Sequence, residues 1–290
     1  MMDKKVCMIT GANSGIGKAA AIQIAQQGYH VIIGCRSQER GEVALQEIRG
    51  KIDSDSIDLM IVDLSLQESI KELAQSFRQK YDTLDVLIHN AAIFDITQKQ
   101  TQYTSEDVES IWATNHLGPV LLTEQLLDPL KNSDQGRVIT IASKGLIAKP
   151  GLKVDLNDPE FRMKKFSVAN AYYQSKRAQV MYTYWLAEKL SDTRITANCI
   201  RVPAVKVDIN KYPTLSPLMK RLYSLKSTFA LSSEEMAETY AYLATSDEVS
   251  SLSGKYFNEN GKQVKSSRYT YQQENINQVM NLTMRYLKKN

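Results

Sequence analysis

The sequence predicts an α/β fold in which one doubly wound parallel sheet of about seven strands is flanked by helices on both faces. Short apolar runs alternate with segments of helical periodicity along nearly the whole chain. The apolar runs contain few polar residues, as expected for strands that are buried on both faces of a parallel sheet. No low-complexity linker or change of composition divides the 290 residues, so we expect residues 1–290 to form a single domain.

Seven apolar runs are the strand candidates, and the helices fall between them. The runs cover residues 5–9, 30–35, 57–62, 84–89, 136–142, 195–200 and 255–257. A regular alternation of strands and helices requires crossover connections, which are almost always right-handed. The longest predicted helix covers residues 169–190.

Sequence signals mark the ends of three helices. Gly28 follows the first helix and suits the left-handed conformation that ends many helices. Ser65 with Glu68, and Ser232 with Glu235, have the spacing of a capping box. We therefore expect two further helices to begin next to Ser65 and Ser232.

Two long segments interrupt the alternation, and each follows a strand. Residues 144–168 are expected to form a long loop, and residues 203–230 contain three prolines and several aromatic residues. Both lie at the carboxyl edge of the predicted sheet, where ligands bind in folds of this kind. We interpret residues 203–230 as a substrate lid, and residues 262–290 as a polar C-terminal extension with one further amphipathic helix.

Composition argues against several classes of function. The 36 basic and 32 acidic residues give a net charge of +4, which is small for a protein that binds nucleic acid. The three histidines lack the spacing of metal ligands, so we expect no metal. Cys7, Cys35 and Cys199 lie in apolar runs and are expected to be reduced thiols of a cytoplasmic protein. We expect a soluble chain without signal peptide or membrane span, because the first strand begins almost at once and no apolar stretch approaches about 18 residues.

A glycine-rich turn at residues 10–17, TGANSGIG, joins the first strand to the first helix. Glycines let the backbone approach a phosphate group closely, and a helix N-terminus offers free N–H groups and partial positive charge. This context predicts a site for the pyrophosphate of a dinucleotide. The other interpretation is an ordinary turn between a strand and a helix. The residues expected to contact the dinucleotide are Gly11, Asn13, Ser14, Gly15, Ile16 and Gly17.

The end of the second strand indicates which dinucleotide is bound. An NAD site usually places a carboxylate there to bind the ribose 2′-hydroxyl, but this chain has Cys35 and Arg36. A guanidinium can pair with a 2′-phosphate, and Lys18 follows the glycines closely. We therefore expect NADP(H) rather than NAD(H). The alternative is that Arg36 is a solvated residue at a strand end.

Tyr172 and Lys176 lie four residues apart on the predicted helix 169–190, so their side chains share a face. A free phenol has a pKa near 10, and a nearby ammonium, helped by an oxidised nicotinamide, would lower it. Tyr172 could then give a proton to a carbonyl oxygen, or take one from an alcohol. Alternatively, the two residues are a helix surface pair, or Tyr173 takes the role, since it lies three residues from Lys176.

These fragments resemble the short-chain dehydrogenase/reductase family in order and spacing. The glycine spacing is Gly-x-x-x-Gly-x-Gly, and residues 171–176, AYYQSK, resemble the family's Ala-Tyr-x-x-Ser-Lys, which favours Tyr172 over Tyr173. The resemblance implies a Rossmann-type fold and two more catalytic residues. Ser143 would orient the substrate oxygen, and Asn115 would help to hold a water relay to Lys176. Without the resemblance, Ser143 would be a strand-end serine and Asn115 a mid-helix asparagine.

The resemblance also implies further cofactor contacts and shows where this chain departs from the family. The additional cofactor residues are Asp63, Leu64, Asn90, Ala91, Pro203 and Val205, with Tyr172 and Lys176 at the nicotinamide ribose. The departures are His89, Ala92, Ala204 and Asp208, where the family has Asn, Gly, Gly and Thr. They leave the four catalytic residues intact and concern the nicotinamide pocket.

Four further strings resemble the retinol dehydrogenase-like, NADP-preferring branch of the family: GCRS at 34–37, NHLG at 115–118, DLN at 155–157 and GKYF at 254–257. The branch implies an enzyme that interconverts a carbonyl and a secondary or primary alcohol on a lipophilic or secondary-metabolite substrate, with reduction favoured. Family members usually form homodimers or homotetramers through the helices that bear the asparagine and the tyrosine. The alternatives are an NADP(H)-binding regulatory or scaffold protein and a C=C reductase.

The proposed lid has an unusual charge. Residues 203–230 carry five basic residues and one acid, so their excess equals that of the whole chain. A concentrated positive charge could attract an anionic substrate, whereas the other interpretation is a solvated helix with its leucines turned inward. The aromatic residues Tyr212, Tyr223 and Phe229 suit a bulky apolar or aromatic substrate.

Overall fold

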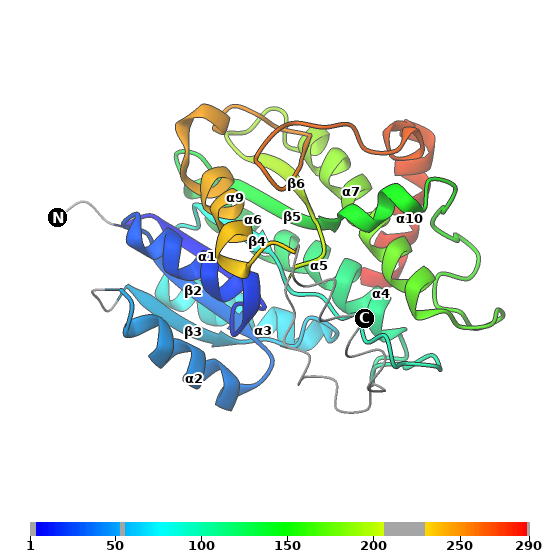
Figure 1. Ribbon diagram of the computed structural model, residues 1–290, viewed down its shortest axis with the longest axis horizontal. Helices are drawn as coiled ribbons and strands as arrows, with labels where there is room; N and C mark the ends of the chain where they lie inside the picture. The colour runs from blue at the N-terminus through cyan, green and yellow to red at the C-terminus, as the bar shows by residue number, and fades with distance from the viewer. Residues whose placement is uncertain (1–3, 53–55, 206–229, 289–290) are drawn as a thin grey trace.

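A computed structural model describes residues 4–52, 56–205 and 230–288 (Figure 1). The seven strands of these residues form one parallel sheet in the order β3-β2-β1-β4-β5-β6-β7. They are β1 Val6–Thr10, β2 His30–Cys35, β3 Ile57–Ile61, β4 Val86–His89, β5 Arg137–Ser143, β6 Thr196–Val202 and β7 Lys255–Phe257. The predicted single doubly wound domain is confirmed. The strand order reverses between β1 and β4, where sheets of this type bind ligands.

Helices cover both faces of the sheet (Figure 1). The α-helices are α1 Gly15–Gln26, α2 Gln38–Arg49, α3 Gln67–Lys80, α4 Ser110–Trp112, α5 Gly118–Gln125, α6 Leu127–Asn132, α7 Val168–Lys189, α9 Ser233–Thr245 and α10 Gln273–Leu287. The short helices are the π-helix η1 Ala113–Leu117 and the 3-10 helices η2 Lys144–Ala148, η4 Asp247–Val249 and η5 Arg268–Tyr271. Each face has its own apolar core: along β1, Met8 packs on one side while Cys7 and Ile9 pack on the other.

Two of the predicted helix ends are confirmed. Gly28 follows α1 with a positive φ of 89°, a conformation that disfavours residues with a Cβ. At the start of α9, the Ser232 hydroxyl accepts a hydrogen bond from the Glu235 N–H at 3.1 Å, and the Glu235 carboxylate accepts one from the Ser232 N–H at 2.7 Å. The reciprocal pair is a complete capping box.

The capping box predicted at Ser65 is wrong. Helix α3 begins at Gln67, and its N-cap residue is Leu66, which makes no side-chain capping bond. The Ser65 hydroxyl instead donates a hydrogen bond to Asp63 Oδ1 at 2.6 Å. The carboxylate just after β3 is a charged acceptor two residues away, and it recruits the serine into a local turn.

Of the two long segments predicted to interrupt the alternation of strands and helices, the structure describes the first in full and the second only at its ends. Residues 144–168 form a long loop that opens with η2 and ends where α7 begins, as predicted. The proposed lid, including Asp208 and the basic residues, lies outside the described residues except for 203–205 and 230.

The C-terminal extension contains the predicted amphipathic helix. Helix α10 buries Ile276, Val279, Met280 and Leu282 in the core, and it packs against α7 and η1 (Figure 1). Within the described residues, none of the helices has both the length and the apolar character needed to cross a membrane. The three cysteines are buried and form no disulfide, as expected.

Candidate active site

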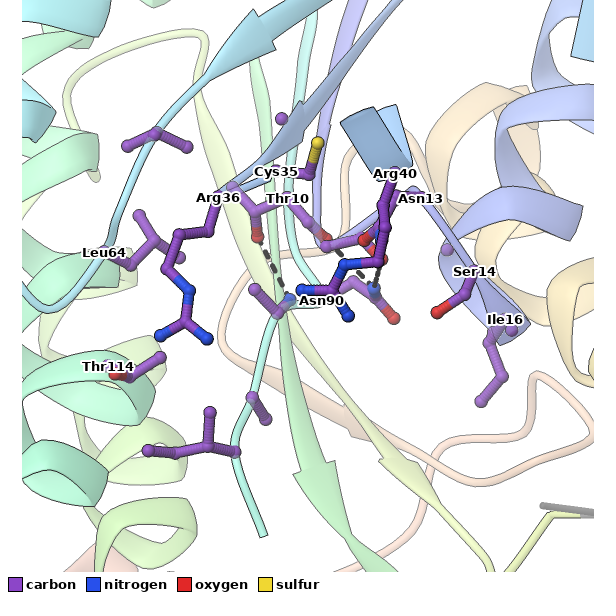
Figure 2. Close-up of a pocket in the computed structure, with 18 of the residues that line it drawn as sticks. Thr10, Asn13, Ser14, Ile16, Cys35, Arg36, Arg40, Leu64, Asn90 and Thr114 are labelled. Atoms are coloured by element: carbon purple, nitrogen blue, oxygen red, sulfur yellow. Dashed lines mark hydrogen bonds between the residues drawn. The ribbon is translucent and has the colours of Figure 1, made fainter. Parts of the chain in front are cut away.

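A cavity of about 720 Å³ lies above the glycine turn, at the carboxyl ends of the central strands (Figure 2). The predicted cofactor residues that line it are Gly11, Asn13, Ser14, Gly15, Ile16, Gly17, Arg36, Asp63, Leu64, Asn90, Ala91 and Val205. Most of the proposed dinucleotide site is thus brought together by the fold. Pro203, Tyr172 and Lys176 do not line this cavity.

The glycine turn has the shape of a phosphate cradle. A Cβ at Gly11 would lie 2.8 Å from Ala91 Cα, and one at Gly17 would lie 2.5 Å from Asn90 Nδ2, so both positions need glycine. A Cβ at Gly15 would meet no atom closer than 4.0 Å, but its φ of +57° disfavours any other residue. Ser14 makes no capping bond, and the first turn of α1 contains no acid. The free N–H groups of this helix end suit the pyrophosphate of a dinucleotide.

Asn90 fixes the turn to the neighbouring strand. Its side-chain amide donates hydrogen bonds to the carbonyls of Thr10 at 2.9 Å and Gly11 at 3.2 Å (Figure 2). Its Oδ1 accepts a hydrogen bond from the Tyr240 hydroxyl at 3.2 Å, and the Ala91 N–H donates one to Thr10 Oγ1 at 3.1 Å. These bonds hold the ends of β1 and β4 together beneath the cavity.

Two arginines reach the cavity from the end of β2 and the start of α2 (Figure 2). The Arg36 guanidinium is 3.9 Å from Asp63 Oδ2, and its side chain is 66% exposed, so it is free to contact a ligand. Arg40 was not predicted from the sequence. Its position in the first turn of α2, just after the strand end, was the available signal.

Lys18, which was expected to add positive charge near the 2′-phosphate of NADP(H), is not found at the cavity. This residue does not line the cavity, and its ammonium pairs with the Glu47 carboxylate. Because this charge is paired with a carboxylate of α2 that does not line the cavity, Lys18 adds no support for NADP(H) over NAD(H).

Helix α7 places Lys176 beside Tyr172. Lys176 is buried, its Nζ lies 5.9 Å from the centre of the Tyr172 ring, and it donates a hydrogen bond to the Ile141 carbonyl at 2.8 Å. The ring of Tyr173 lies instead against Gly145, where a Cβ would be 2.4 Å from the Tyr173 hydroxyl. The geometry therefore favours Tyr172 over Tyr173 as the partner of Lys176.

The charge state of Tyr172 differs from the expectation. Burial raises the pKa of Tyr172 to about 12, and a hydrogen bond with Ser143 acts in the opposite direction. Burial also lowers the pKa of Lys176 to about 8. The predicted lowering of the Tyr172 pKa by Lys176 is not found in this structure, because the ammonium lies over the ring and burial of the phenol dominates.

Ser143 and Phe94 complete the surroundings of the phenol. Ser143 ends β5, and its hydroxyl accepts a hydrogen bond from the Gly145 N–H at 3.2 Å in addition to its bond with Tyr172. Phe94 stacks on the ring of Tyr172 with centroids 4.3 Å apart. Because the preceding residues 90–93 line the cavity, this segment connects the proposed dinucleotide site to the catalytic residues.

Asn115 is buried in the π-helix η1, and its side chain holds neighbouring segments together through hydrogen bonds. Its Oδ1 accepts a hydrogen bond from the Ile93 N–H at 2.8 Å, and its amide donates to the Ile93 carbonyl at 3.0 Å and to Ser175 Oγ at 3.3 Å. Position 119 is a proline, which lacks the N–H that would bond the Asn115 carbonyl in a regular α-helix. The main-chain carbonyl of Asn115 therefore lacks the partner four residues on that a regular α-helix would supply.

The departures from the family pattern cause no backbone strain in the described residues. Apart from glycines, positive φ values occur there at Asp107 and Phe161, so neither Ala92 nor Ala204 requires glycine. His89 is buried and bonds Thr123 through Nε2 at 2.7 Å, while its Nδ1 has no partner in the described structure. No group of three or more His, Cys, Asp or Glu residues is placed to hold a metal ion in these parts of the chain.

The family model for short chain dehydrogenases matches residues 5–152. This chain belongs to the short-chain dehydrogenase family. It is 33% identical to retinol dehydrogenase 13 of Mus musculus over 87% of this chain and 75% of the relative. It is 35% identical to retinol dehydrogenase 12 of the same species over 91% of this chain and 80% of the relative. The predicted resemblance to retinol dehydrogenases is confirmed, and the chain is an oxidoreductase of this family.

Solved structures of other proteins share the fold. A crystal structure of a protein from Mycobacterium Paratuberculosis has a TM-score of 0.73 and 24% identity, covering 98% of this chain and 93% of the other. A short-chain dehydrogenase from Escherichia coli CFT073, complexed with NADPH, has a TM-score of 0.68 and 22% identity, covering 89% and 97%. The fold is therefore one that accommodates a nicotinamide cofactor, as the cradle above α1 also indicates.

Proposed function

We propose that this short-chain dehydrogenase is an NADP(H)-dependent enzyme that interconverts a carbonyl and an alcohol on a lipophilic substrate, with reduction favoured. The observation that carries the proposal is the grouping of Tyr172 with Lys176, whose Nζ lies 5.9 Å from the centre of the phenol ring, and with Ser143, whose hydroxyl lowers the pKa of the phenol. The similarity to retinol dehydrogenases supports chemistry between an alcohol and a carbonyl.

Each of the four residues has a defined part in the proposed reaction. The bound nicotinamide supplies or accepts the hydride. Tyr172 donates its phenolic proton to the substrate oxygen in reduction and takes it back in oxidation. Ser143 keeps its own hydroxyl hydrogen available for the substrate oxygen or for Tyr172, because it accepts from the Gly145 N–H.

Lys176 and Asn115 support this proton transfer. Lys176 has three N–H donors, of which one bonds the Ile141 carbonyl, so two remain for ribose hydroxyls and for water. The main-chain carbonyl of Asn115, freed from a helical partner by Pro119, would hold that water. This chain of groups would return protons to Tyr172 after each turnover.

The preference for NADP(H) rests on positive charge at the adenosine end of the cavity. Arg36 and Arg40 both line it, and a guanidinium can bind a phosphate with two parallel hydrogen bonds. Asp63 also lines the cavity, but it accepts hydrogen bonds from the N–H and hydroxyl of Ser65. We propose that it contacts the adenine edge rather than the ribose 2′-hydroxyl. The cytoplasmic location stays a prediction from cysteine usage.

The proposed function is tested by following nucleotide oxidation with bulky ketones and aldehydes, using NADPH and NADH in parallel. We expect turnover of at least one carbonyl with preference for NADPH, and an alcohol as product. Tight NADPH binding without turnover across such compounds would favour the regulatory or scaffold alternative. A saturated ketone formed from an enone would favour the C=C reductase.

A further inference from the structure

We propose that His116, Gln179 and Thr283 form a buried clamp through which the C-terminal helix α10 positions the π-helix that carries Asn115. The three residues come from η1, α7 and α10, and would act as positioning residues. The inference rests on the proposed function, because the segment they hold contains a proposed catalytic residue.

The clamp is made of short contacts between fully buried side chains. His116 Nε2 lies 2.7 Å from Thr283 Oγ1. The side-chain amide of Gln179 lies 3.3 Å from His116 Nδ1 and 3.3 Å from the His116 carbonyl. The three side chains are at most 1% exposed, so water does not compete for these bonds.

The direction of every hydrogen bond in the clamp follows from one hydroxyl. Thr283 Oγ1 donates its single hydrogen to the Val279 carbonyl at 2.8 Å, so toward His116 it can act only as an acceptor. The proton of His116 is therefore on Nε2, and its Nδ1 accepts a hydrogen bond from the Gln179 amide. Each of these donors meets an acceptor in that one tautomer of the histidine, while Gln179 Oε1 has no partner among the described residues.

Burial also keeps the clamp in one charge state. A second proton on His116 would place an N–H against the N–H₂ group of Gln179, and burial lowers the pKa of His116 to about 3. Among the residues that the structure describes, no charged group contributes to this shift, since burial is its one cause, and the ring packed on the histidine, that of Trp112 with its centroid 4.5 Å away, carries no charge. The histidine acts as a neutral bridge and not as a pH switch.

The clamp acts at the point where the helix is irregular. The π-helix η1 ends at Leu117, two residues before Pro119, so the regular pattern of main-chain bonds is interrupted beside Asn115. Side-chain bonds from α7 replace it: Ser175 bonds the Asn115 amide, and Gln179, three residues after Lys176, bonds His116. Thr283 supports the histidine from the other side, so α10 helps to set the distance between Asn115 and Lys176.

Removal of α10 would expose its buried apolar face and could unfold the protein. Substitutions of the Thr283 side chain alone therefore test the positioning role without removing the helix. Thr283→Val keeps the shape of the side chain but leaves the Nε2–H of His116 without an acceptor, whereas Thr283→Ser restores the hydroxyl. Thr245→Val on the distant helix α9 is the control, because it makes the same substitution at a hydroxyl that lies 2.7 Å from the carbonyl four residues earlier and also contacts Gln27 Oε1.

We expect Thr283→Val to lower kcat for carbonyl reduction roughly 10- to 100-fold, with KM for NADPH nearly unchanged, and Thr283→Ser to recover most of it. The main-chain amides of residues 113–118 should exchange hydrogen faster in Thr283→Val than in the wild type or in Thr245→Val. Unchanged exchange would overturn the clamp. Faster exchange with wild-type kcat would overturn its positioning role.

The exchange measurement also separates this inference from the proposed function. It needs no substrate, so it decides whether the clamp exists even if wild-type protein reduces no carbonyl. In that case the proposed function fails and the clamp is a structural link between α10 and η1, which would overturn the positioning role.

Discussion

At the scale of single residues, the phenol of Tyr172 determines what the site can do. It is half-buried and stacked on Phe94, and its pKa is raised to about 12. At neutral pH the phenol therefore keeps its proton and is prepared to act as an acid toward a carbonyl. Oxidation of an alcohol requires the phenolate, which burial disfavours.

This charge state predicts different pH dependences for the two directions. Because the folded-state pKa is raised, the protonated phenol needed for reduction dominates at neutral pH and is lost only in alkaline solution. The rate of alcohol oxidation should therefore rise with pH up to about 10, while the titration of Tyr172 leaves the rate of reduction nearly constant over the same range. Initial rates of both directions between about pH 6 and 10 would check this. An oxidation rate that falls over that range would contradict the assignment of Tyr172 as the acid and base.

Arg36 is predicted to select the 2′-phosphate. Arg36→Ala should weaken NADPH binding about 10- to 100-fold, the size of a lost charge-assisted hydrogen bond, and leave NADH binding nearly unchanged. Titration of nicotinamide fluorescence measures both affinities. Lys18→Ala is the control, because Lys18 pairs with Glu47 outside the cavity and should leave both affinities unchanged. An equal loss for the two nucleotides would refute the selection.

At the residue scale, the sequence indicated candidates where the residue type itself carries the chemistry, and their roles stay predictions. The glycines, Arg36 and Tyr172 could be found because few other residues serve at those positions. Arg40 was missed since a basic residue in a helical turn is common, and only the fold shows that it faces the cavity. The raised pKa of Tyr172 depends on burial, which a one-dimensional pattern does not give.

At the scale of elements, the turn before α1 depends on close backbone approach. Gly17→Ala would place a Cβ 2.5 Å from Asn90 Nδ2 and 2.8 Å from the Gly11 carbonyl. We expect this overlap to cost about 1–3 kcal/mol of stability and to weaken NADPH binding. Thermal unfolding and nucleotide titration measure the two effects.

The control for this variant is Gly50→Ala at the end of α2. A Cβ there would lie no closer than 3.7 Å to its neighbours, and the residue already has α-helical dihedral angles. It should therefore be nearly neutral in stability and in nucleotide affinity. Wild-type stability and affinity in Gly17→Ala would show that the cradle is not as tight as the structure indicates.

Strands were easier to predict than helix ends. The apolar runs locate all seven strands to within two residues at each end, because a strand buried on both faces leaves a continuous apolar signature. Ser65 fits the sequence pattern of a cap, but the nearby Asp63 captures its hydroxyl. The π-helix η1 depends on tertiary bonds from Ser175 and Gln179, which the local sequence does not reveal.

At the scale of the whole molecule, the C-terminal extension changes which surfaces are free. The family resemblance leads to an expectation of homodimers or homotetramers through the helices that bear Asn115 and Tyr172, which are η1 and α7. Helix α10 packs against both and buries Ile276, Val279 and Met280 in the common core. The sequence predicted this amphipathic helix but not the face that it covers, because a hydrophobic stripe does not identify its partner.

We therefore predict that the protein is a monomer at micromolar concentrations. Light scattering coupled to gel filtration should give a mass near 32.8 kDa. A stable dimer or tetramer would contradict this prediction, and slowed hydrogen exchange in α7 on assembly would show that the expected interface is used in spite of α10.

The central claim is that Tyr172 carries out proton transfer to a substrate oxygen in an NADPH-dependent reaction. The most direct measurement is kcat for reduction of a carbonyl by wild type, Tyr172→Phe and Tyr173→Phe, with NADPH affinity measured on each. Phenylalanine keeps the ring that stacks on Phe94, so only the phenol is lost. We predict that Tyr172→Phe lowers kcat about 10²- to 10⁴-fold with NADPH still bound, while Tyr173→Phe remains active. Turnover by Tyr172→Phe at the wild-type rate, or its loss in Tyr173→Phe alone, would contradict the account.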